Sequence, residues 1–187
     1  LENKGYGCSL GQFITQDGCE LPSPETLREA IIKDPASRQA AAQADCLRLM
    51  SQFQLKPGFH AVKNRNKKAS ILANAYAHGV PVSVHPGIGY DIITNHPMFK
   101  GSIVGRAAES DFELFCKAVE GLDQGSVLSI GSAIMGPQVF EKSLSCVHNV
   151  RRQEDRQNVT GHSIHVVDLQ DGGKWDWTKG EPPKNSP

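Results

Sequence analysis

Three short apolar runs, each followed by a polar loop that contains glycine, stand out in the hydrophobic pattern of the chain. They cover residues 80–84, 126–130 and 163–167. Short runs rich in valine and isoleucine, bounded by glycine or proline, are typical of β-strands. A weaker strand is expected over residues 102–104. The pattern therefore predicts three or four short strands.

Helical spacing of apolar residues separates these strands. It appears over residues 111–122, between the first two runs, and over residues 136–147, between the second and the third. Strands that alternate with helices of this length are typical of right-handed crossovers and a parallel sheet. The sequence therefore predicts an α/β fold, in which helices cover both faces of a parallel sheet.

The first third of the chain reads as a mainly helical lead-in. Ser23-Pro24-Glu25 offers an N-cap, a proline at the first helical position and an early acid, which together predict a helix start. A second helix is expected from Asp34-Pro35 to about Met50, and a third over residues 64–78. Residues 1–22 are glycine-rich and are expected to be irregular.

We interpret residues 1–187 as a single α/β domain with three parts. These are a lead-in over 1–58, a sheet core over 59–170 and a loop-rich tail over 171–187. Because the chain starts at Leu1 and stops within a turn-rich segment, we expect it to be a fragment of a longer protein.

The charge balance and the short apolar runs argue against nucleic acid and membranes as partners. The 187 residues include 20 basic and 20 acidic side chains, so the formal net charge is zero. This balance gives no electrostatic reason to expect nucleic acid or an anionic membrane surface as a partner. No apolar run approaches the roughly 20 residues that span a bilayer. We therefore expect neither nucleic acid binding nor membrane insertion.

The cysteines and histidines indicate no metal site. The five cysteines are scattered and form no CxxC pair, which predicts neither a disulfide framework nor a zinc site. His148, His162 and His165 lack the spacing of metal ligands. Reduced thiols and the lack of a secretory signal favour the cytoplasm.

The loop over residues 85–91 has the richest chemistry. Gly87 and Gly89 would let the backbone approach a ligand closely. Asp91 could accept hydrogen bonds from a ribose or an amine, and His85 could move protons near neutral pH. The alternative is an ordinary tight connection in which Asp91 caps a helix.

The loop over residues 131–137 resembles a phosphate cradle. Gly131, Ser132 and Ala133 follow a strand, and a helix is expected to begin near Pro137. The free N–H groups and the dipole at a helix start favour an anion. The pattern lacks a complete GxGxxG motif, so small residues that only pack the helix on the strand remain an alternative.

The third loop, over residues 168–173, combines carboxylates with glycines. Asp168 ends the last strand and Asp171 precedes two glycines. Tryptophans near the carboxylates could attract a cation. The alternative is a loop folded over the core with exposed lysines. The neighbouring candidates for an aromatic, charged pocket are Lys174, Trp175, Trp177 and Lys179.

The order of these motifs resembles the deoxyhypusine synthase family. The resemblance covers roughly residues 60–170. It rests on three segments: Ala75–Val82, the Gly-Tyr-Asp of the first loop, and Phe115-Cys116-Lys117 followed by Ser129-Ile130-Gly131-Ser132-Ala133. It implies a Rossmann-like sheet, NAD as cofactor, transfer of an aminobutyl group from spermidine through an enzyme-bound imine, and a homo-oligomer, either a dimer or a tetramer.

The resemblance also implies roles for the loop residues. Gly131, Ser132 and Ala133 match the family's glycine run beside NAD, and Asp168 falls near the strand end that borders the dinucleotide. From their place in the loops, Gly87, Gly89 and Asp171 are also expected to contact NAD. His85 and Asp91 are expected to serve the amine chemistry, and Lys174 or Lys179 to form the imine. Two alternatives stay open: a non-catalytic nucleotide-binding or assembly protein, favoured by the absence of the family's Trp-Gly-Lys triplet, and a Rossmann-like enzyme for a phosphorylated small molecule.

Overall fold

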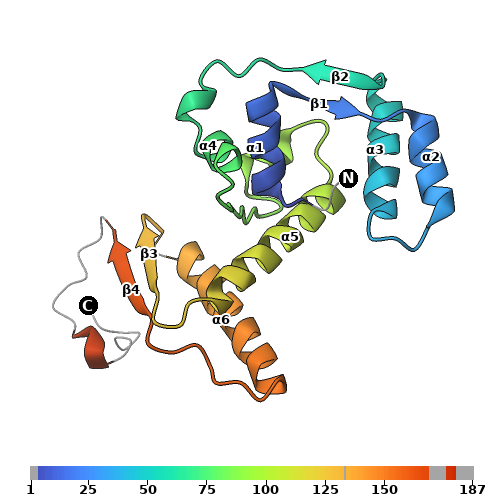
Figure 1. The fold of residues 1–187 in the computed structure, drawn as a ribbon. Helices are drawn as coiled ribbons and strands as arrows, with labels where there is room; N and C mark the ends of the chain where they lie inside the picture. The colour runs from blue at the N-terminus through green and yellow to red at the C-terminus, as the bar shows by residue number, and fades with distance from the viewer. Residues whose placement is uncertain (1–3, 133, 169–175, 180–187) are drawn as a thin grey trace. The chain divides into compact units, whose positions relative to one another are not determined.

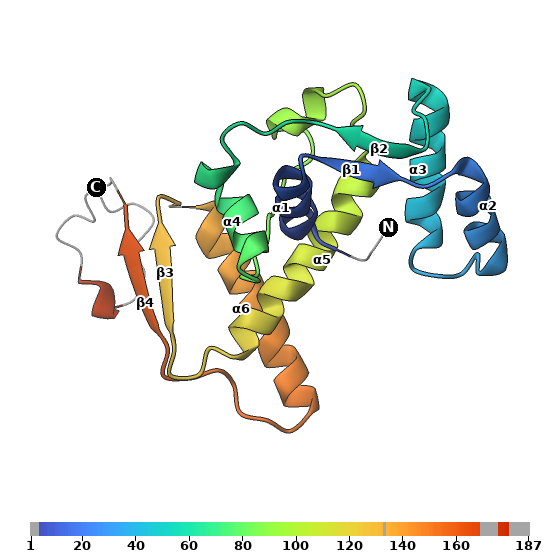
Figure 2. The same ribbon diagram turned by 45° about the horizontal axis from the view of Figure 1, so that its top comes forward.

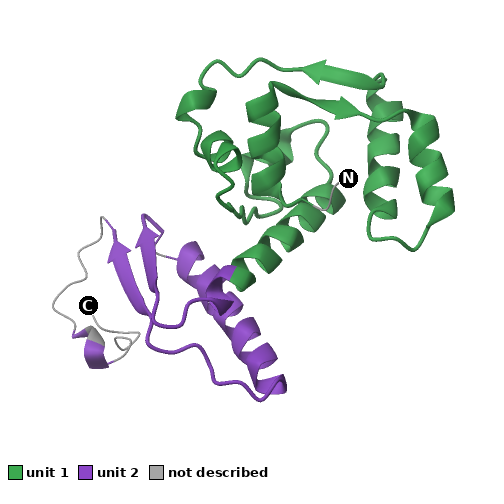
Figure 3. Ribbon diagram, viewed as in Figure 1, with its two compact units in different colours: residues 1–117 green, residues 118–187 purple. Residues whose placement is uncertain are grey.

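The computed structural model of the protein describes residues 4–132, 134–168 and 176–179 (Figures 1 and 2). Within these residues the fold is mixed α/β, with six α-helices and two sheets of two strands each. The chain divides into two compact units, residues 1–117 and residues 118–187, and the boundary falls inside helix α5, Gly101–Glu120 (Figure 3). The predicted parts, with divisions near residues 58 and 170, stay a prediction.

Unit 1 combines helices with a small antiparallel sheet. Strands β1 and β2 pair so that Gly18 lies opposite Ala61 and Leu21 lies opposite Gly58. Helix α1 packs against α4, and α2 packs against α3. Besides the greater part of α5, the elements are α1 (Tyr6–Gln16), β1 (Gly18–Leu21), α2 (Pro24–Lys33), α3 (Ala40–Phe53), β2 (Gly58–Ala61), α4 (Ile71–Ala77) and the 3₁₀ helices η1 (Lys67–Ala69) and η2 (Ile92–Asn95).

Helix α2 confirms the predicted start at Ser23. The Ser23 Oγ accepts a hydrogen bond from the Thr26 N–H at 3.1 Å, which satisfies one of the free donors at the helix start. Leu27 is buried on the inner face. Helix α3 begins at Ala40, several residues after the predicted start at Asp34-Pro35, and it extends past Met50 to Phe53.

The predicted irregular segment at residues 1–22 instead contains α1 and β1. Its glycines are sites of close approach rather than signs of a loop. A Cβ at Gly7 would lie 2.1 Å from the carbonyl oxygen of Val82, and a Cβ at Gly11 would lie 2.5 Å from that of Leu72. The glycines therefore let α1 pack tightly against neighbouring backbone.

The predicted strand over residues 80–84 is wrong. In the described part of the chain this segment pairs with no strand. Instead, the Val84 N–H donates to Asp111 Oδ2 at 2.8 Å, and the Gly7 N–H donates to the same oxygen at 2.9 Å. Asp111 lies on α5 and is fully buried. A buried carboxylate thus accepts one backbone hydrogen bond of this segment, that of Val84.

Two helix predictions in unit 1 also need correction. Residues 102–104 form the first turn of α5 rather than a strand, and α5 begins ten residues before the expected position at Asp111. The predicted helix over residues 64–78 is split into η1 and α4, because the Ser70 Oγ accepts the Ala73 N–H at 3.2 Å and starts a new helix.

Unit 2 contains a strand–helix–strand arrangement. Strands β3 (Ser126–Ile130) and β4 (Ser163–Val167) are parallel and connected through helix α6 (Met135–Gln153). Both strands have the predicted bounds, and α6 extends the predicted helix by six residues at its end. Among the described residues, the predicted parallel sheet is reduced to this pair, so the fold is established only as mixed α/β.

Arg151, near the end of α6, connects the segment before β3 with the segment before β4. The side chain is 7% exposed and forms an ion pair with Asp123 Oδ2 at 2.6 Å. The guanidinium also donates to the backbone oxygens of Glu120 and Gln157. Asp123 Oδ1 in turn accepts the Thr160 N–H at 2.9 Å. The hydrogen bond from Arg151 lowers the pKa of the Asp123 carboxyl, so this pair is charged at neutral pH.

Candidate functional site

The ends of β3 and β4 bring two of the predicted loops together. The Gly131 N–H donates to the carbonyl oxygen of Val167 at 2.9 Å, which continues the sheet by one hydrogen bond. Ser132 and Asp168 therefore follow two neighbouring strand ends, as parallel pairing requires. The φ angle of Gly131 is 68°, a left-handed conformation that favours glycine. Among the described residues no atom lies within 4 Å of a Cβ built there.

The start of α6 provides the predicted helix N-terminus beside this edge. The Ser132 Oγ accepts a hydrogen bond from the Gly136 N–H at 2.8 Å. A Cβ at Gly136 would lie 2.9 Å from this oxygen, so glycine permits the close approach. The first turn of α6 contains no acidic residue. The positive end of the helix dipole is therefore not neutralised by its own side chains.

The loop over residues 85–91 belongs to unit 1, and its carboxylate serves the loop itself. The Gly87 N–H donates to Asp91 Oδ2, and the Asp91 N–H donates to the Gly87 carbonyl oxygen at 3.2 Å. The Asp91 carbonyl oxygen accepts from Thr94 Oγ1 at 2.8 Å. Gly89 has a φ angle of 101°. The geometry matches a tight connection, although Asp91 does not cap η2 through its side chain.

His85 is half-buried beside α5. Its Nε2 lies 3.0 Å from Ser83 Oγ, and its ring meets Phe115 edge-on, with ring centroids 5.4 Å apart. Burial lowers the pKa of His85, and the negative charge of Asp111 opposes part of this effect. His85 is therefore neutral at pH 7 and available as a proton acceptor.

Of the two predicted imine-forming lysines, the structure describes Lys179. Lys179 is 71% exposed and lies 3.6 Å from Asp176 Oδ2. Imine-forming lysines are usually activated in a hydrophobic pocket or beside another cation. Hydrogen bonds from Thr178 lower the pKa of Asp176, which keeps this carboxylate charged. Ala133, Asp171, Lys174 and Trp175 lie outside the described residues.

Sequence reasoning missed Asp111. It was predicted only as the start of a helix. Its signal is its spacing from Val104 and Val119, which places a carboxylate at a buried position of α5. A charged residue on a buried helix face needs hydrogen-bonding partners, and Asp111 finds them in the backbone of distant segments.

Comparisons with protein-family models, with curated proteins and with solved structures found no match. Within the part of the chain that the structure describes, no helix is long and apolar enough to cross a bilayer. In the same residues, no three or more histidine, cysteine or acidic side chains gather where they could hold a metal ion.

Proposed function

We propose that this protein binds NAD through the β3–α6–β4 arrangement and is a deoxyhypusine synthase-like protein with a Rossmann-like fold. The observation that carries the proposal is the order strand, glycine loop, helix and parallel strand, with Gly131 in a left-handed conformation at the turn. In dinucleotide-binding folds, this arrangement brings a pyrophosphate to the start of the helix at the carboxyl ends of the strands.

The described residues suit the parts of NAD. The positive end of α6 favours the pyrophosphate through its dipole, because the Gly136 N–H already donates to Ser132 Oγ and Pro137 has no N–H. Asp168, at the end of β4, offers a carboxylate for ribose hydroxyl groups. Gly87 and Gly89 belong to unit 1, and their contact with NAD stays a prediction.

The proposed chemistry is an NAD-dependent transfer from an amine or polyamine. The carbon next to nitrogen would give a hydride to NAD⁺ and the nitrogen would lose a proton, which leaves an imine and NADH. The amino group of a lysine would add to the imine carbon and the original amine would leave. NADH would then return the hydride to the new imine. His85 belongs to unit 1, and its role as the acceptor of this proton stays a prediction. Lys174 and Lys179 are the lysine candidates, and Asp91 is the candidate that orients the amine.

A second candidate is nucleotide binding without catalysis. The hydrogen bond from the Gly87 N–H to the Asp91 carboxylate favours it, because this carboxylate already closes its own loop. Lys179, exposed and beside Asp176, also lacks the surroundings of an activated lysine.

We also propose a homo-oligomer. Leu128, Ile130 and Val167 are more than half exposed, and the register of the sheet places them on one face. Parallel sheets normally have both faces covered. Light scattering of the purified protein measures the oligomeric state.

The proposal is tested by thermal unfolding with NAD. A ligand at about 100 times its dissociation constant stabilises by roughly 2.7 kcal/mol, a shift that is easily measured. Ser132→Asp keeps a capping oxygen for α6 but adds a negative charge beside the expected pyrophosphate, and we expect it to abolish the shift. Ser126→Asp makes the same change at the other end of β3 and should preserve it.

The outcomes separate the two candidates. No shift with NAD for the unmodified protein would overturn the proposal, as would equal losses in the two serine variants. A shift with NAD together with absorbance near 340 nm on adding spermidine supports the transferase. A shift with NAD and no such absorbance supports nucleotide binding without catalysis.

A further inference from the structure

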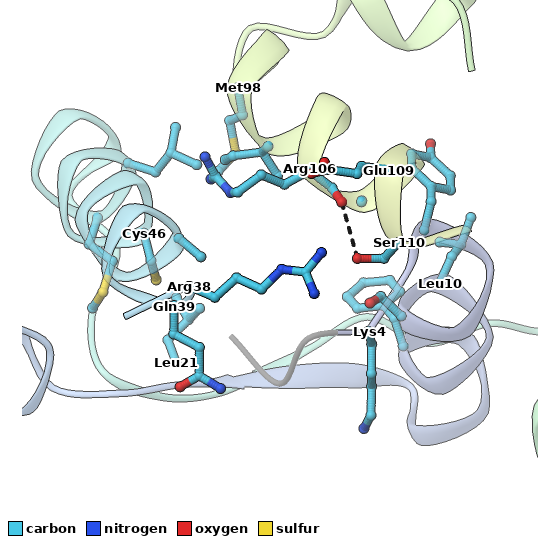
Figure 4. A pocket seen from close by; sticks show the side chains of 18 of the residues that line it. Lys4, Leu10, Leu21, Arg38, Gln39, Cys46, Met98, Arg106, Glu109 and Ser110 are labelled. Carbon is cyan, nitrogen blue, oxygen red and sulfur yellow. Dashed lines mark hydrogen bonds between the residues drawn. The ribbon is translucent and has the colours of Figure 1, made fainter. Parts of the chain in front are cut away.

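Unit 1 contains a pocket with a volume of about 540 Å³ (Figure 4). This volume lies within the range of roughly 300–1,000 Å³ that is usual for small-molecule sites. Most of its wall is apolar, and three helices contribute to it. The apolar lining includes Leu10 and Phe13 of α1, Leu49 and Met50 of α3, and Ile103 and Ala107 of α5.

The charged side chains at this pocket are mainly basic. Of the described residues, Lys4, Arg38 and Arg106 line it, together with one acidic residue, Glu109. Figure 4 shows the Arg38 side chain extending into the pocket from the segment before α3. Both arginines are paired with carboxylates, so an anion that carries an apolar group would bind here by exchange of one of these pairs and not through a net positive charge.

The two arginines differ in how firmly they are held. Arg106 pairs with Asp45, a largely buried carboxylate that also accepts a hydrogen bond from Ser102 Oγ at 2.8 Å. Arg38 pairs with Glu113 at 2.7 Å, and these two side chains are 62% and 50% exposed. An exposed ion pair contributes little to stability. Arg38 can therefore exchange Glu113 for another carboxylate at small cost.

We propose that this pocket binds a carboxylate with a hydrocarbon tail. The guanidinium of Arg38 pairs with the carboxylate of the ligand in place of Glu113, and the tail lies against the apolar wall. A planar guanidinium matches a carboxylate with two parallel hydrogen bonds, which makes arginine well suited to this role. The pocket lies wholly in unit 1, so this proposal is independent of NAD binding at the end of β3.

Cys46 provides a local readout, because it lines the pocket, whereas Cys146 is exposed on α6. Alkylation of each cysteine can be followed by mass spectrometry in the presence of decanoate. We expect decanoate to slow the alkylation of Cys46 and not that of Cys146. Decanol, which has the same tail and no charge, should protect Cys46 much less.

Three variants test the role of Arg38. Arg38→Gln should weaken decanoate binding roughly ten- to a hundredfold, as expected for the loss of hydrogen bonds to a charged group. Glu113→Gln should tighten binding, because it removes the competing carboxylate. Arg28→Gln, which changes an exposed arginine paired with Glu25 on α2, should have no effect.

Ala107→Leu tests the apolar wall. The larger side chain would fill part of the pocket and should weaken decanoate binding, and leucine is a good helix former, so α5 should be retained. Thermal unfolding of each variant checks that the fold is retained. The proposal is overturned if decanoate leaves Cys46 unprotected, if decanol protects it equally, or if Arg38→Gln binds decanoate as well as the unmodified protein.

Discussion

Replacing Asp111 by alanine should destabilise unit 1, because two backbone N–H groups lose their acceptor. The N–H groups of Gly7 and Val84 lie 2.9 and 2.8 Å from Asp111 Oδ2, and the carboxylate is fully buried. A buried donor left without a partner costs about 1–3 kcal/mol, which sums to about 2–6 kcal/mol. Removing Asp111 also removes the desolvation of its own buried carboxylate, so we expect about 2–4 kcal/mol.

Urea unfolding followed by circular dichroism measures this change. Glu109→Ala is the matched control, because Glu109 is an exposed acid on the same helix and should change stability by less than about 0.5 kcal/mol. Asp111→Asn should give an intermediate loss, since its amide oxygen can still accept both N–H groups. A loss below about 1 kcal/mol for Asp111→Ala would refute the view that this carboxylate organises unit 1.

The remaining predictions concern His85 and helix α1. His85 should titrate below its ordinary pKa of 6.5, so its contribution to stability falls as the pH drops below 6.5, where the unfolded chain binds the proton more readily. Its NMR titration should shift to a still lower pKa in Asp111→Asn, and a rise would contradict this reasoning. Gly7→Ala should destabilise the protein, because the new Cβ would lie 2.1 Å from the carbonyl oxygen of Val82. Gly105→Ala on α5 is the control: its Cβ would have no described atom within 4 Å, and alanine should stabilise the helix by about 0.5–1 kcal/mol. Thermal unfolding distinguishes these opposite signs.

Unit 2 shows how far local pattern predicts structure. The bounds of β3 and β4 follow from short apolar runs bounded by glycine, and their parallel pairing follows from the helical segment between them. The adjacency of Gly131 and Asp168 then follows from the register of the pair. This part of the candidate site was therefore predictable from the sequence.

The structure of unit 1 differs from the prediction where contacts with residues far away in the sequence determine the local conformation. Residues 80–84 have the composition of a strand, yet the Val84 N–H donates to Asp111 and not to a neighbouring strand. The glycines of α1 looked like loop residues, but they permit contact with backbone more than 60 residues away. Asp91 was predicted to bind a ligand because a carboxylate beside glycines is typical of binding loops. In the folded loop, its carboxylate accepts a hydrogen bond from the Gly87 N–H.

The sequence by itself determined the elements whose causes lie within a few residues. The Ser23 cap, the strand β3 and the strand β4 belong to this group, because capping and alternation act over short distances. Only the tertiary structure showed which N–H groups donate to the buried carboxylate of Asp111, and that the Arg38 side chain extends into the pocket (Figure 4). The physical reason is that hydrogen bonds and ion pairs across 27 to 104 residues of sequence leave no local pattern.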